Sequence, residues 1–401
     1  MKLTERSAKC IVDATCNQSP VSGLTHDFYR YPARFSPIFA ASAIGAFTEP
    51  GDTVLDPFLG GGTTLVEGCV SGRTVVGTDI SALATFVSRV KTTPITRRDA
   101  TAIGKWGEDV SSSLKIHRCL SRSGSAIRQD SFPNNMSTVE VWRIRKLIEL
   151  ALDRVSELCS IRQREFARCS ILRAAQWALD CRTQVPSVMQ FRHELSQRVK
   201  SMITGSLQFR EHCRVAWPTT RGRPPKRCHI LNASACDLPQ LLSRLSGLGK
   251  AKLVLTSPPY PGVYVLYHRW KIRGRWETPA PFWISNQQDG HGHNHYLMHN
   301  RKEDGLHKYF ENIRNAFAAV RLCIDKKAVV VQLIAFKDPS WQVPAYLRAM
   351  EDAGYVELSP ESLGIRSQQR LRRSVPGRRW FAIIQGDLKT SDEYVLFHQP
   401  K

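Results

Sequence analysis

The stretch Asp56-Pro57-Phe58-Leu59-Gly60-Gly61-Gly62-Thr63-Thr64 decides the fold of this chain. It follows the short apolar run 53–55 and precedes a segment, 63–70, that has the pattern of a helix. Glycines at such a turn let the backbone approach a ligand, and open parallel sheets bind ligands at the carboxyl ends of their strands. The turn has Leu65 where a dinucleotide site has its third glycine, and it lacks the lysine of a P-loop. It therefore predicts a site for a cofactor without a pyrophosphate.

A second strand and a second helix follow this turn. Residues 74–79 are predicted to form a second strand that ends in an acid, and residues 82–90 have the pattern of a helix. Strand, turn, helix and strand make the βαβ unit of a parallel sheet. Asp79, at the end of its strand, is placed to accept hydrogen bonds from the hydroxyl groups of a ribose. We therefore expect Asp56 and Asp79 to lie in one compact site.

The last part of the chain returns to strand-like patterns. Strands are predicted at 228–232, 252–255 and 328–334, and the last is a continuous apolar run typical of a strand buried in a parallel sheet. Residues 380–384 and 394–397 are expected to pair as a terminal hairpin.

The middle of the chain, residues 99–226, has a different pattern. Its apolar residues recur at helical spacing and its net charge is +10. The simplest organisation is an α/β catalytic domain, residues 1–98 and 227–401, that is interrupted by a basic helical insertion. We expect the catalytic domain to fold without this insertion.

The composition of the chain favours a nucleic acid as its partner. Lys and Arg number 57 against 35 Asp and Glu, a formal net charge of +22. Such a field attracts polyanions, although a charged, solvated surface is the simpler alternative. No run of about eighteen or more apolar residues occurs, so we expect no membrane span. Eleven cysteines without a C-x-x-C pair, and no secretion signal, indicate reduced thiols and a cytoplasmic protein.

A second motif, Thr256-Ser257-Pro258-Pro259-Tyr260, directly follows the predicted strand 252–255. A ring-conjugated amino nitrogen becomes nucleophilic when preorganised hydrogen-bond acceptors point at its N–H bonds. The Ser257 hydroxyl and the backbone at Pro258 can supply two such acceptors, and consecutive prolines hold the segment extended. Tyr260 offers a face on which a flipped-out base can stack. The alternative is a rigid turn with a packing tyrosine.

Together the two motifs resemble those of the DNA amino-methyltransferases, which methylate cytosine-N4 or adenine-N6. The resemblance implies a Rossmann-like seven-stranded methyltransferase sheet that binds S-adenosylmethionine. It assigns cofactor binding to Asp56, Phe58, Gly60, Gly62, Thr63, Asp79 and Asp237 and, in the segment before the loop, to Tyr31, Pro32 and Arg34. It assigns catalysis to Ser257, Pro258, Pro259 and Tyr260. The S-P-P-Y form favours cytosine, because adenine-N6 members more often carry D-P-P-Y or N-P-P-Y.

The reaction implied by this resemblance is direct methyl transfer to DNA, without a metal. No Pro-Cys nucleophile lies near Tyr260, which argues against cytosine-C5 chemistry. An RNA guanine-N2 methyltransferase and a catalytically idle nucleic-acid-binding subunit are the alternatives, and a restriction or defence-system partner is compatible with this interpretation.

Two regions are candidates for target recognition. One is the basic insertion, and the other is residues 262–310, where aromatic and basic side chains alternate in a way that suits stacking on bases and contacts to phosphates. The histidines within 291–299 favour a polar loop over a metal site.

Overall fold

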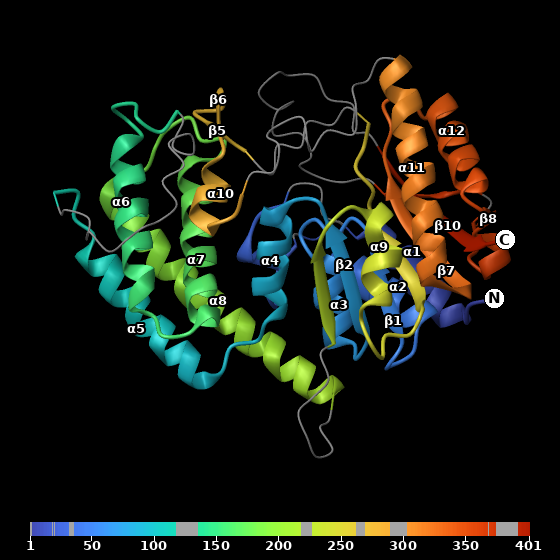
Figure 1. Ribbon diagram of the computed structural model, residues 1–401, viewed down its shortest axis with the longest axis horizontal. Coiled ribbons are helices and arrows are strands. Elements are labelled where there is room, and N and C mark those ends of the chain that lie inside the picture. Colours follow the sequence, from blue (N-terminus) through green and yellow to red (C-terminus); the bar gives the residue numbers. More distant parts are fainter. Residues whose placement is uncertain are drawn as a thin grey trace.

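The computed structural model describes residues 2–17, 19, 21–31, 36–117, 135–217, 227–261, 269–288, 303–367, 369–373 and 392–401. Its centre is a mostly parallel sheet with helices on both faces, and a group of helices lies beside this sheet (Figure 1). The expectations for Pro32 and Arg34, for the histidines at 291–299 and for the strand 380–384 fall on residues outside the described ranges.

The central sheet has eight strands, seven of which follow the order β3-β2-β1-β4-β7-β10-β8. Neighbouring strands from β3 to β7 are parallel, whereas β10 is antiparallel to β7 and to β8. This arrangement confirms the expected α/β class with a Rossmann-like, mostly parallel sheet. The short β9 also pairs with β10. The bounds are β1 (Thr53–Asp56), β2 (Thr74–Asp79), β3 (Cys228–Asn232), β4 (Ala251–Thr256), β7 (Ile324–Ile334), β8 (Tyr355–Leu358), β9 (Leu371–Arg373) and β10 (Glu393–Pro400).

Alternating side chains of the central strands feed two separate cores. In β1, Val54 packs into the core on one face of the sheet and Leu55 into the core on the other. The same alternation occurs in β2 and β4, because the register places Val54 beside Leu253 and Leu55 beside Val254. Since both faces are covered, the central residues of these strands are apolar and buried on both sides of the sheet.

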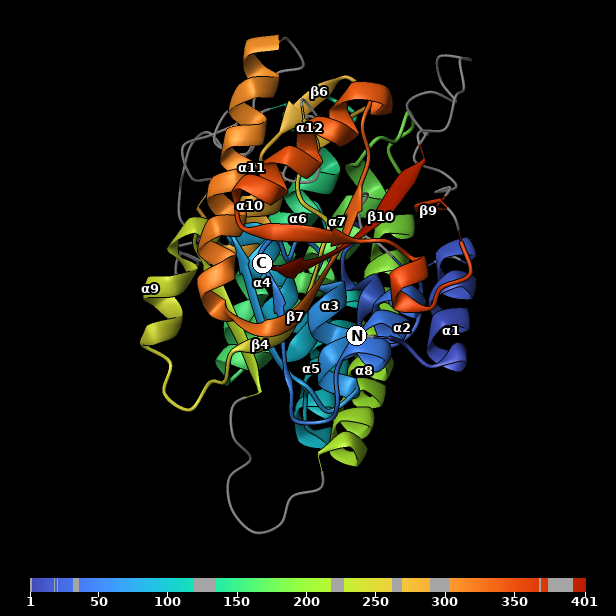
Figure 2. The same ribbon diagram turned by 90° about the vertical axis from the view of Figure 1, so that its right-hand side faces the viewer.

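Helices cover both faces of the sheet, as two orthogonal views show (Figures 1 and 2). One face carries α1 (Glu5–Cys16), α2 (Pro37–Phe47), α3 (Thr63–Val70) and α4 (Ala82–Thr92). The other carries α9 (Leu238–Ser243), α11 (Glu303–Cys323) and α12 (Pro339–Asp352). Within the described ranges, no helix combines the length and the apolarity that crossing a membrane requires.

The helical unit contains α5 (Arg97–Ser113), α6 (Trp142–Asp153), α7 (Ile161–Leu179) and α8 (Val188–Ala216). Three of these helices begin with a reciprocal capping box, in which Thr96, Ser160 and Ser187 each exchange hydrogen bonds with the residue three positions on. Such caps satisfy backbone N–H groups that a helix start leaves open. The predicted helical character of residues 99–226 therefore has a local cause at each of these starts.

A later segment of the chain completes the helical unit. It consists of β5 (Trp270–Ile272), β6 (Trp276–Thr278) and α10 (Ala280–Ser285). Ile272 forms a bridge with Asp180, and Arg168 Nη1 donates to the Ile284 carbonyl at 3.0 Å. The boundaries at 99 and 226 stay a prediction, but the unit built around these helices extends to residues near 285.

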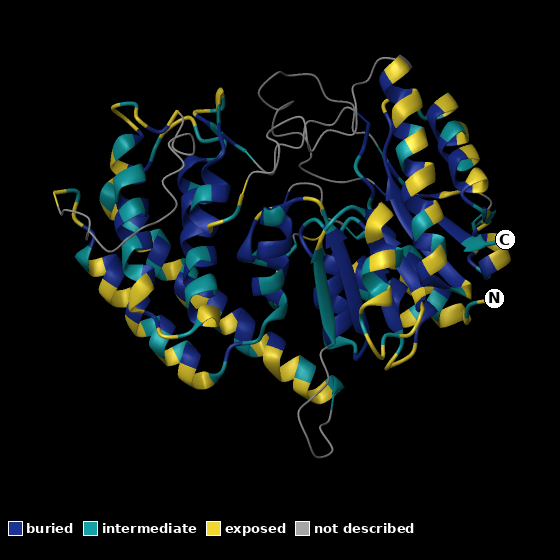
Figure 3. Ribbon diagram, in the orientation of Figure 1, coloured by how far each residue is buried: buried dark blue, intermediate teal, exposed yellow. Residues whose placement is uncertain are grey.

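The core on the face of the sheet that carries α1 to α4 is continuous with the core of the helical unit. Val54 and Leu253 belong to the same buried cluster as Phe166, Phe191 and many other residues of α5 to α8. Helix α7 is buried along most of its length (Figure 3). Because the cluster is shared, removal of the insertion would expose the surfaces of α3 and α4 that α8 and α7 cover, and we no longer expect the remaining α/β domain to fold alone.

Candidate active site

The two sequence motifs meet at the carboxyl ends of β1 and β4. Asp56, which ends β1, is 1% exposed, and Thr256 ends the adjacent strand β4. Thr256 Oγ1 donates to Asp56 Oδ1 at 2.7 Å, although the two residues are 200 positions apart in the chain. The glycine-rich loop and the S-P-P-Y segment therefore begin from two hydrogen-bonded residues.

Asp79 holds the glycine-rich loop from the neighbouring strand. Its Oδ2 accepts from the Gly60 N–H at 3.0 Å, and its Oδ1 accepts from the Ser81 N–H at 2.9 Å. A carboxylate oxygen has a second lone pair, so these bonds leave acceptor capacity for a ligand. Asp79 is only partly buried. It can thus support the loop and still accept from ribose hydroxyl groups.

The loop requires glycine at its last position. Gly62 has φ +73°, and a Cβ there would lie 2.5 Å from Ser88 Oγ. Lys91, on α4, is 1% exposed and donates from Nζ to the Gly61 carbonyl at 2.7 Å. Sequence reasoning missed Lys91, because a single lysine in a helical pattern normally indicates a solvated face.

The segment before the loop, residues 24–31, crosses above it, and we call this segment the strap. Tyr31 packs closely against the loop, because a Cβ on Gly61 would lie 3.1 Å from Tyr31 Cβ and 3.4 Å from its ring atom Cγ. At the other end of the strap, His26 Nε2 lies 2.6 Å from Glu67 Oε1 on α3. The structure therefore places Tyr31 beside the loop, as expected.

Helices α7 and α8 hold the strap in place. Gln176 accepts from the Arg30 N–H and donates to the Arg30 carbonyl, both at 2.9 Å. Arg173 donates to the Asp27 carbonyl at 3.0 Å, and Arg198 donates to the Asp27 carboxylate at 3.2 Å. These anchors were missed from the sequence, and they make the helical unit a structural part of the site.

Three other predicted cofactor residues take different positions. Phe58 is half-buried against Phe317, with ring centroids 6.2 Å apart, and Thr63 is buried at the start of α3. Asp237 ends the 3-10 turn Ala235–Asp237 that follows β3, and its side chain is exposed. Phe58 and Thr63 thus lie on either side of the three glycines in the sequence, whereas Asp237 lies in the connection between β3 and α9.

The S-P-P-Y segment is tied to two further strands. Ser257 Oγ lies 3.1 Å from the Tyr260 hydroxyl and 3.1 Å from the Leu333 carbonyl on β7. The Tyr260 hydroxyl donates to Glu393 Oε1 at 3.0 Å, and Arg373 Nη1 pairs with Glu393 Oε2 at 3.3 Å. Sequence reasoning assigned a role only to the ring face of Tyr260 and missed Glu393. It interpreted Arg373 as part of a basic run that contacts a nucleic-acid backbone or solvent, whereas its side chain is buried against Glu393.

Burial changes the acidity of both loop carboxyl groups. Desolvation raises the pKa of Asp56 from 3.8 to about 6, against the lowering effect of hydrogen bonds from Thr256, Thr64 and the Phe58 N–H. Desolvation likewise raises the pKa of Asp79 to about 6. Shifted carboxyl groups at the end of adjacent strands are typical of a functional site.

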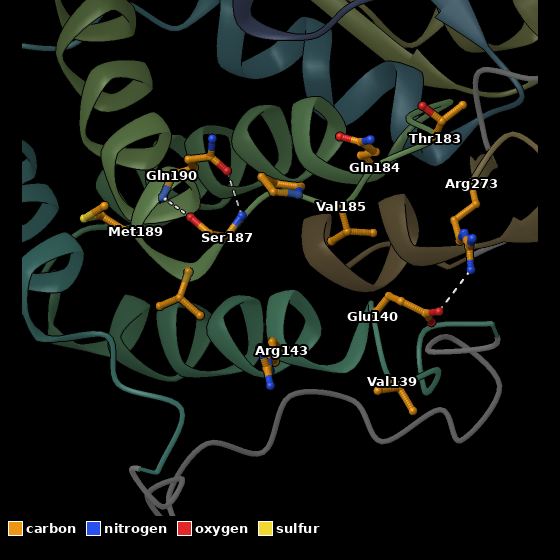
Figure 4. Close-up of a pocket in the computed structure, with 12 residues that line it drawn as sticks. Val139, Glu140, Arg143, Thr183, Gln184, Val185, Ser187, Met189, Gln190 and Arg273 are labelled. Carbon is orange, nitrogen blue, oxygen red and sulfur yellow. Dashed lines mark hydrogen bonds and ion pairs between the residues drawn. The ribbon is translucent and has the colours of Figure 1, made fainter.

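A separate cavity of about 900 Å³ opens in the helical unit (Figure 4). Its wall combines the start of α6, the connection before α8 and the turn between β5 and β6, where Arg273 Nη1 pairs with Glu140 Oε1 at 3.1 Å. Its lining is polar and cationic as well as apolar and includes Arg143, Gln184, Val185 and Met189. In the part of the chain that the structure describes, no three His, Cys, Asp or Glu side chains are grouped to hold a metal ion.

Comparison with known sequences identifies relatives of the first part of the chain. Residues 13–84 match the sequence model of the DNA methylase family (N6_N4_Mtase). A curated relative, the Type II methyltransferase M.MvaI of Kocuria varians, is 43% identical over 75 residues, which are 18% of this chain and 16% of that protein. The matched part of the chain thus covers about a sixth of the length of that relative. Both findings support the DNA amino-methyltransferase family that the motifs indicated.

Solved structures resemble the chain only weakly. TrmN from Thermus thermophilus has a TM-score of 0.31 at 12% identity, covering 92% of this chain and 49% of its own. The rRNA methyltransferase aviRa from Streptomyces viridochromogenes has a TM-score of 0.29 at 10% identity, and the match covers 99% of this chain and 94% of aviRa.

Proposed function

We propose that this chain, whose residues 13–84 match the DNA methylase family, is a site-specific DNA methyltransferase. It would transfer a methyl group from S-adenosylmethionine to an exocyclic base amino group, with cytosine-N4 preferred over adenine-N6 because serine precedes Pro-Pro-Tyr. The observation that best supports this proposal is the hydrogen bond between Thr256 and Asp56. It joins the residue at the start of the glycine-rich loop to the residue at the start of the S-P-P-Y segment, so the two motifs begin side by side. The named relative is a Type II methyltransferase, so the proposal includes a restriction-modification role in the cytoplasm.

The residues of the loop fit S-adenosylmethionine. Asp79 retains acceptor capacity for ribose hydroxyl groups, and Asp56 places a carboxyl group at the end of the neighbouring strand. Tyr31 and Phe58 add apolar walls on either side of the glycines, and the proposal includes Pro32, Arg34 and Asp237 as further contacts. When bound, the cofactor supplies an electrophilic methyl group on a sulfonium centre.

The S-P-P-Y residues would prepare the target amino group. Ser257 Oγ and the Pro258 carbonyl accept from its two N–H bonds, which localises the nitrogen lone pair for attack. Pro258 and Pro259 hold both acceptors in place, so little reorganisation accompanies the reaction. The Tyr260 ring stacks on the extruded base.

The target-recognition surface would combine both candidate regions of the sequence. Arg273 from β5–β6 and Arg143 from α6 line the same cavity, and Lys271 N–H donates to Asp180 at the end of α7. With Arg275, the exposed arginines Arg143 and Arg273 present positive charge beside that cavity. Such a face suits contacts to DNA phosphates.

Replacing Arg143, Arg273 and Arg275 together by glutamine is expected to weaken DNA binding and to make its salt dependence shallower. The log–log slope should fall by about one for each phosphate that the variant no longer neutralises. Fluorescence anisotropy of a labelled duplex at several salt concentrations measures both. The control removes three exposed charges near the amino ends of the sheet strands, Arg214, Lys252 and Lys326. Equal slopes for the two triple variants would exclude this surface.

Cofactor affinity is expected to fall as the pH drops below about 6. The pKa of Asp56 and of Asp79 is about 6 in the free protein, and binding needs the ionised forms, which accept hydrogen bonds and attract the sulfonium charge. Affinity should therefore be constant above pH 7. Below pH 6, each of the two carboxyl groups should lower it by up to about tenfold for every pH unit. Titration calorimetry from pH 5 to 8 measures it, and Asp79→Asn should make the decline less steep. Equal affinity at pH 5 and pH 7.5 would contradict this role.

The function itself is tested by product analysis. The protein is incubated with S-adenosylmethionine and unmethylated plasmid DNA of mixed sequence, the DNA is digested, and its nucleosides are identified by mass spectrometry. The expected product is N4-methylcytosine, and N6-methyladenine would keep the enzyme class but change the base. Methylation of guanine-N2 in RNA, with none in DNA, would favour the RNA alternative. Cofactor affinity that cannot be detected would favour the idle subunit.

A further inference from the structure

We propose that Glu393, paired with Arg373, is a positioning residue for methyl transfer. It takes the hydrogen bond of the Tyr260 hydroxyl and so keeps Ser257 Oγ as an acceptor for the target amino group. This inference rests on the proposed function, because the acceptor role of Ser257 belongs to it.

The geometry connects four side chains from three separate parts of the chain. Glu393 begins β10, Arg373 ends β9, and these two strands pair so that the two residues are direct partners in the sheet. Their side chains are 6% and 7% exposed. Glu393 Oε1 lies 3.0 Å from the Tyr260 hydroxyl, which itself lies 3.1 Å from Ser257 Oγ.

The protons of these groups determine which oxygen can accept. An ionised carboxylate only accepts and an arginine only donates, and both Arg373 and the Tyr260 hydroxyl donate to Glu393, so the Tyr260 proton points away from Ser257. The single proton of Ser257 then goes to the Leu333 carbonyl or to the Tyr260 oxygen, which both lie at 3.1 Å. In either case Ser257 presents only lone pairs to a bound base.

Stability alone explains this buried pair poorly. Removing two charges from water costs more than their attraction returns unless hydrogen bonds satisfy the remaining groups. A leucine and a methionine would fill the same space between β9 and β10 without that cost. A charged acceptor that binds the Tyr260 hydroxyl fixes Ser257 Oγ as a hydrogen-bond acceptor toward the base, which apolar side chains at these positions cannot do.

The variant Glu393→Gln reverses this polarity without changing the size of the side chain. Arg373 still needs an acceptor, so the amide oxygen turns to Arg373 and the amide N–H₂ donates to the Tyr260 oxygen. Tyr260 then donates to Ser257 Oγ and occupies the lone pair that the target amino group needs. We expect the single-turnover methylation rate to fall about tenfold to a hundredfold, with the Kd for cofactor and the KM for DNA unchanged within about twofold.

The double variant tests whether Glu393 acts through Tyr260. Tyr260→Phe removes the hydroxyl while Ser257 keeps its bond to the Leu333 carbonyl, so this variant should be more active than Glu393→Gln. In the Tyr260→Phe background, Glu393→Gln should cost less than about threefold. Equal losses in both backgrounds would show that the carboxylate acts on stability alone and would overturn the proposal. Should Glu393→Gln fail to fold, Glu393→Asp serves instead, because it keeps the charge but withdraws from Tyr260.

A spectroscopic measurement follows the hydrogen bond without any turnover. With tyrosine labelled at Cζ with ¹³C, the Tyr260 resonance should shift in Glu393→Gln. The matched control is Glu357→Gln on β8, which breaks the exposed pair of Glu357 with Arg370 beside the same strand. The control should leave both the resonance and the methylation rate unchanged.

The outcomes separate this inference from the proposed function. An active wild-type enzyme with an equally active Glu393→Gln variant overturns the positioning role alone, as does an unshifted Tyr260 resonance. A wild-type protein that binds cofactor but methylates neither DNA nor RNA overturns the proposed function and this inference together.

Discussion

Tyr260→Ala is expected to lower kcat/KM for DNA methylation by about tenfold to a hundredfold. Stacking of a base on an aromatic face contributes about 1–3 kcal/mol, and alanine removes the face entirely. The truncation also removes a donor from Glu393, which is 4% exposed and would keep only part of its hydrogen bonding. Single-turnover methylation and cofactor titration measure the two effects separately.

The structure changes what Tyr260→Phe should do. From the sequence alone, phenylalanine should retain most of the activity, because only the ring face of Tyr260 had a role. Since the hydroxyl donates to Glu393, we now expect an intermediate rate, above that of Tyr260→Ala and below wild type. Trp341→Ala on α12 is the control, since it removes a partly exposed aromatic ring from outside the site. Tyr260→Ala with wild-type activity would remove the stacking role.

Gly205→Ala is expected to reduce both the stability of the protein and its affinity for cofactor. Gly205 lies on α8 where the strap crosses, and a Cβ there would collide with the carbonyl group of Leu24. That group belongs to the backbone and cannot rotate away, so the strap must move, and overpacking of this kind costs about 1–3 kcal/mol. Because the strap carries Tyr31 over the glycine-rich loop, its displacement should also open the cofactor site.

The matched control for this variant is Gly104→Ala on α5. A Cβ at Gly104 would meet only Ile203 Cδ1 at 3.7 Å, an ordinary contact. This change should leave cofactor binding unaltered and raise stability by about 0.5–1 kcal/mol, as alanine does within a helix. Thermal unfolding and calorimetry of both variants give the comparison. If Gly205→Ala binds cofactor as wild type does, the strap is not coupled to the site.

The site was predictable where it depends on local sequence. Asp56 and Asp79 each end a predicted strand, and parallel strands bring their carboxyl ends to one edge of a sheet. The strand before Ser257 was equally clear, so its closeness to Asp56 followed once β1 and β4 were neighbours.

The remaining contacts depend on the packing of distant segments. Gln176 occupies a helix position like any other polar residue, and only the path of the strap past α7 makes it a clamp for Arg30. Glu393 begins a strand that was predicted from 394, and its partner Arg373 lies on β9, three residues long and without a clear pattern. A buried acid at a strand start gives no signal in the sequence, since most such residues are solvated.

The pairing of β1 with β4 also has a consequence for how the protein is made. Thr256 lies 200 positions after Asp56, and the chain up to it takes on the order of 10–40 s to synthesise at typical rates of translation. During that time one edge of β1 has no partner, and an unpaired apolar edge is a template for association with other chains. Contacts so distant in sequence also slow folding. We therefore expect slow refolding from denaturant, and a yield of soluble protein that rises when synthesis is cooled or chaperones are supplied.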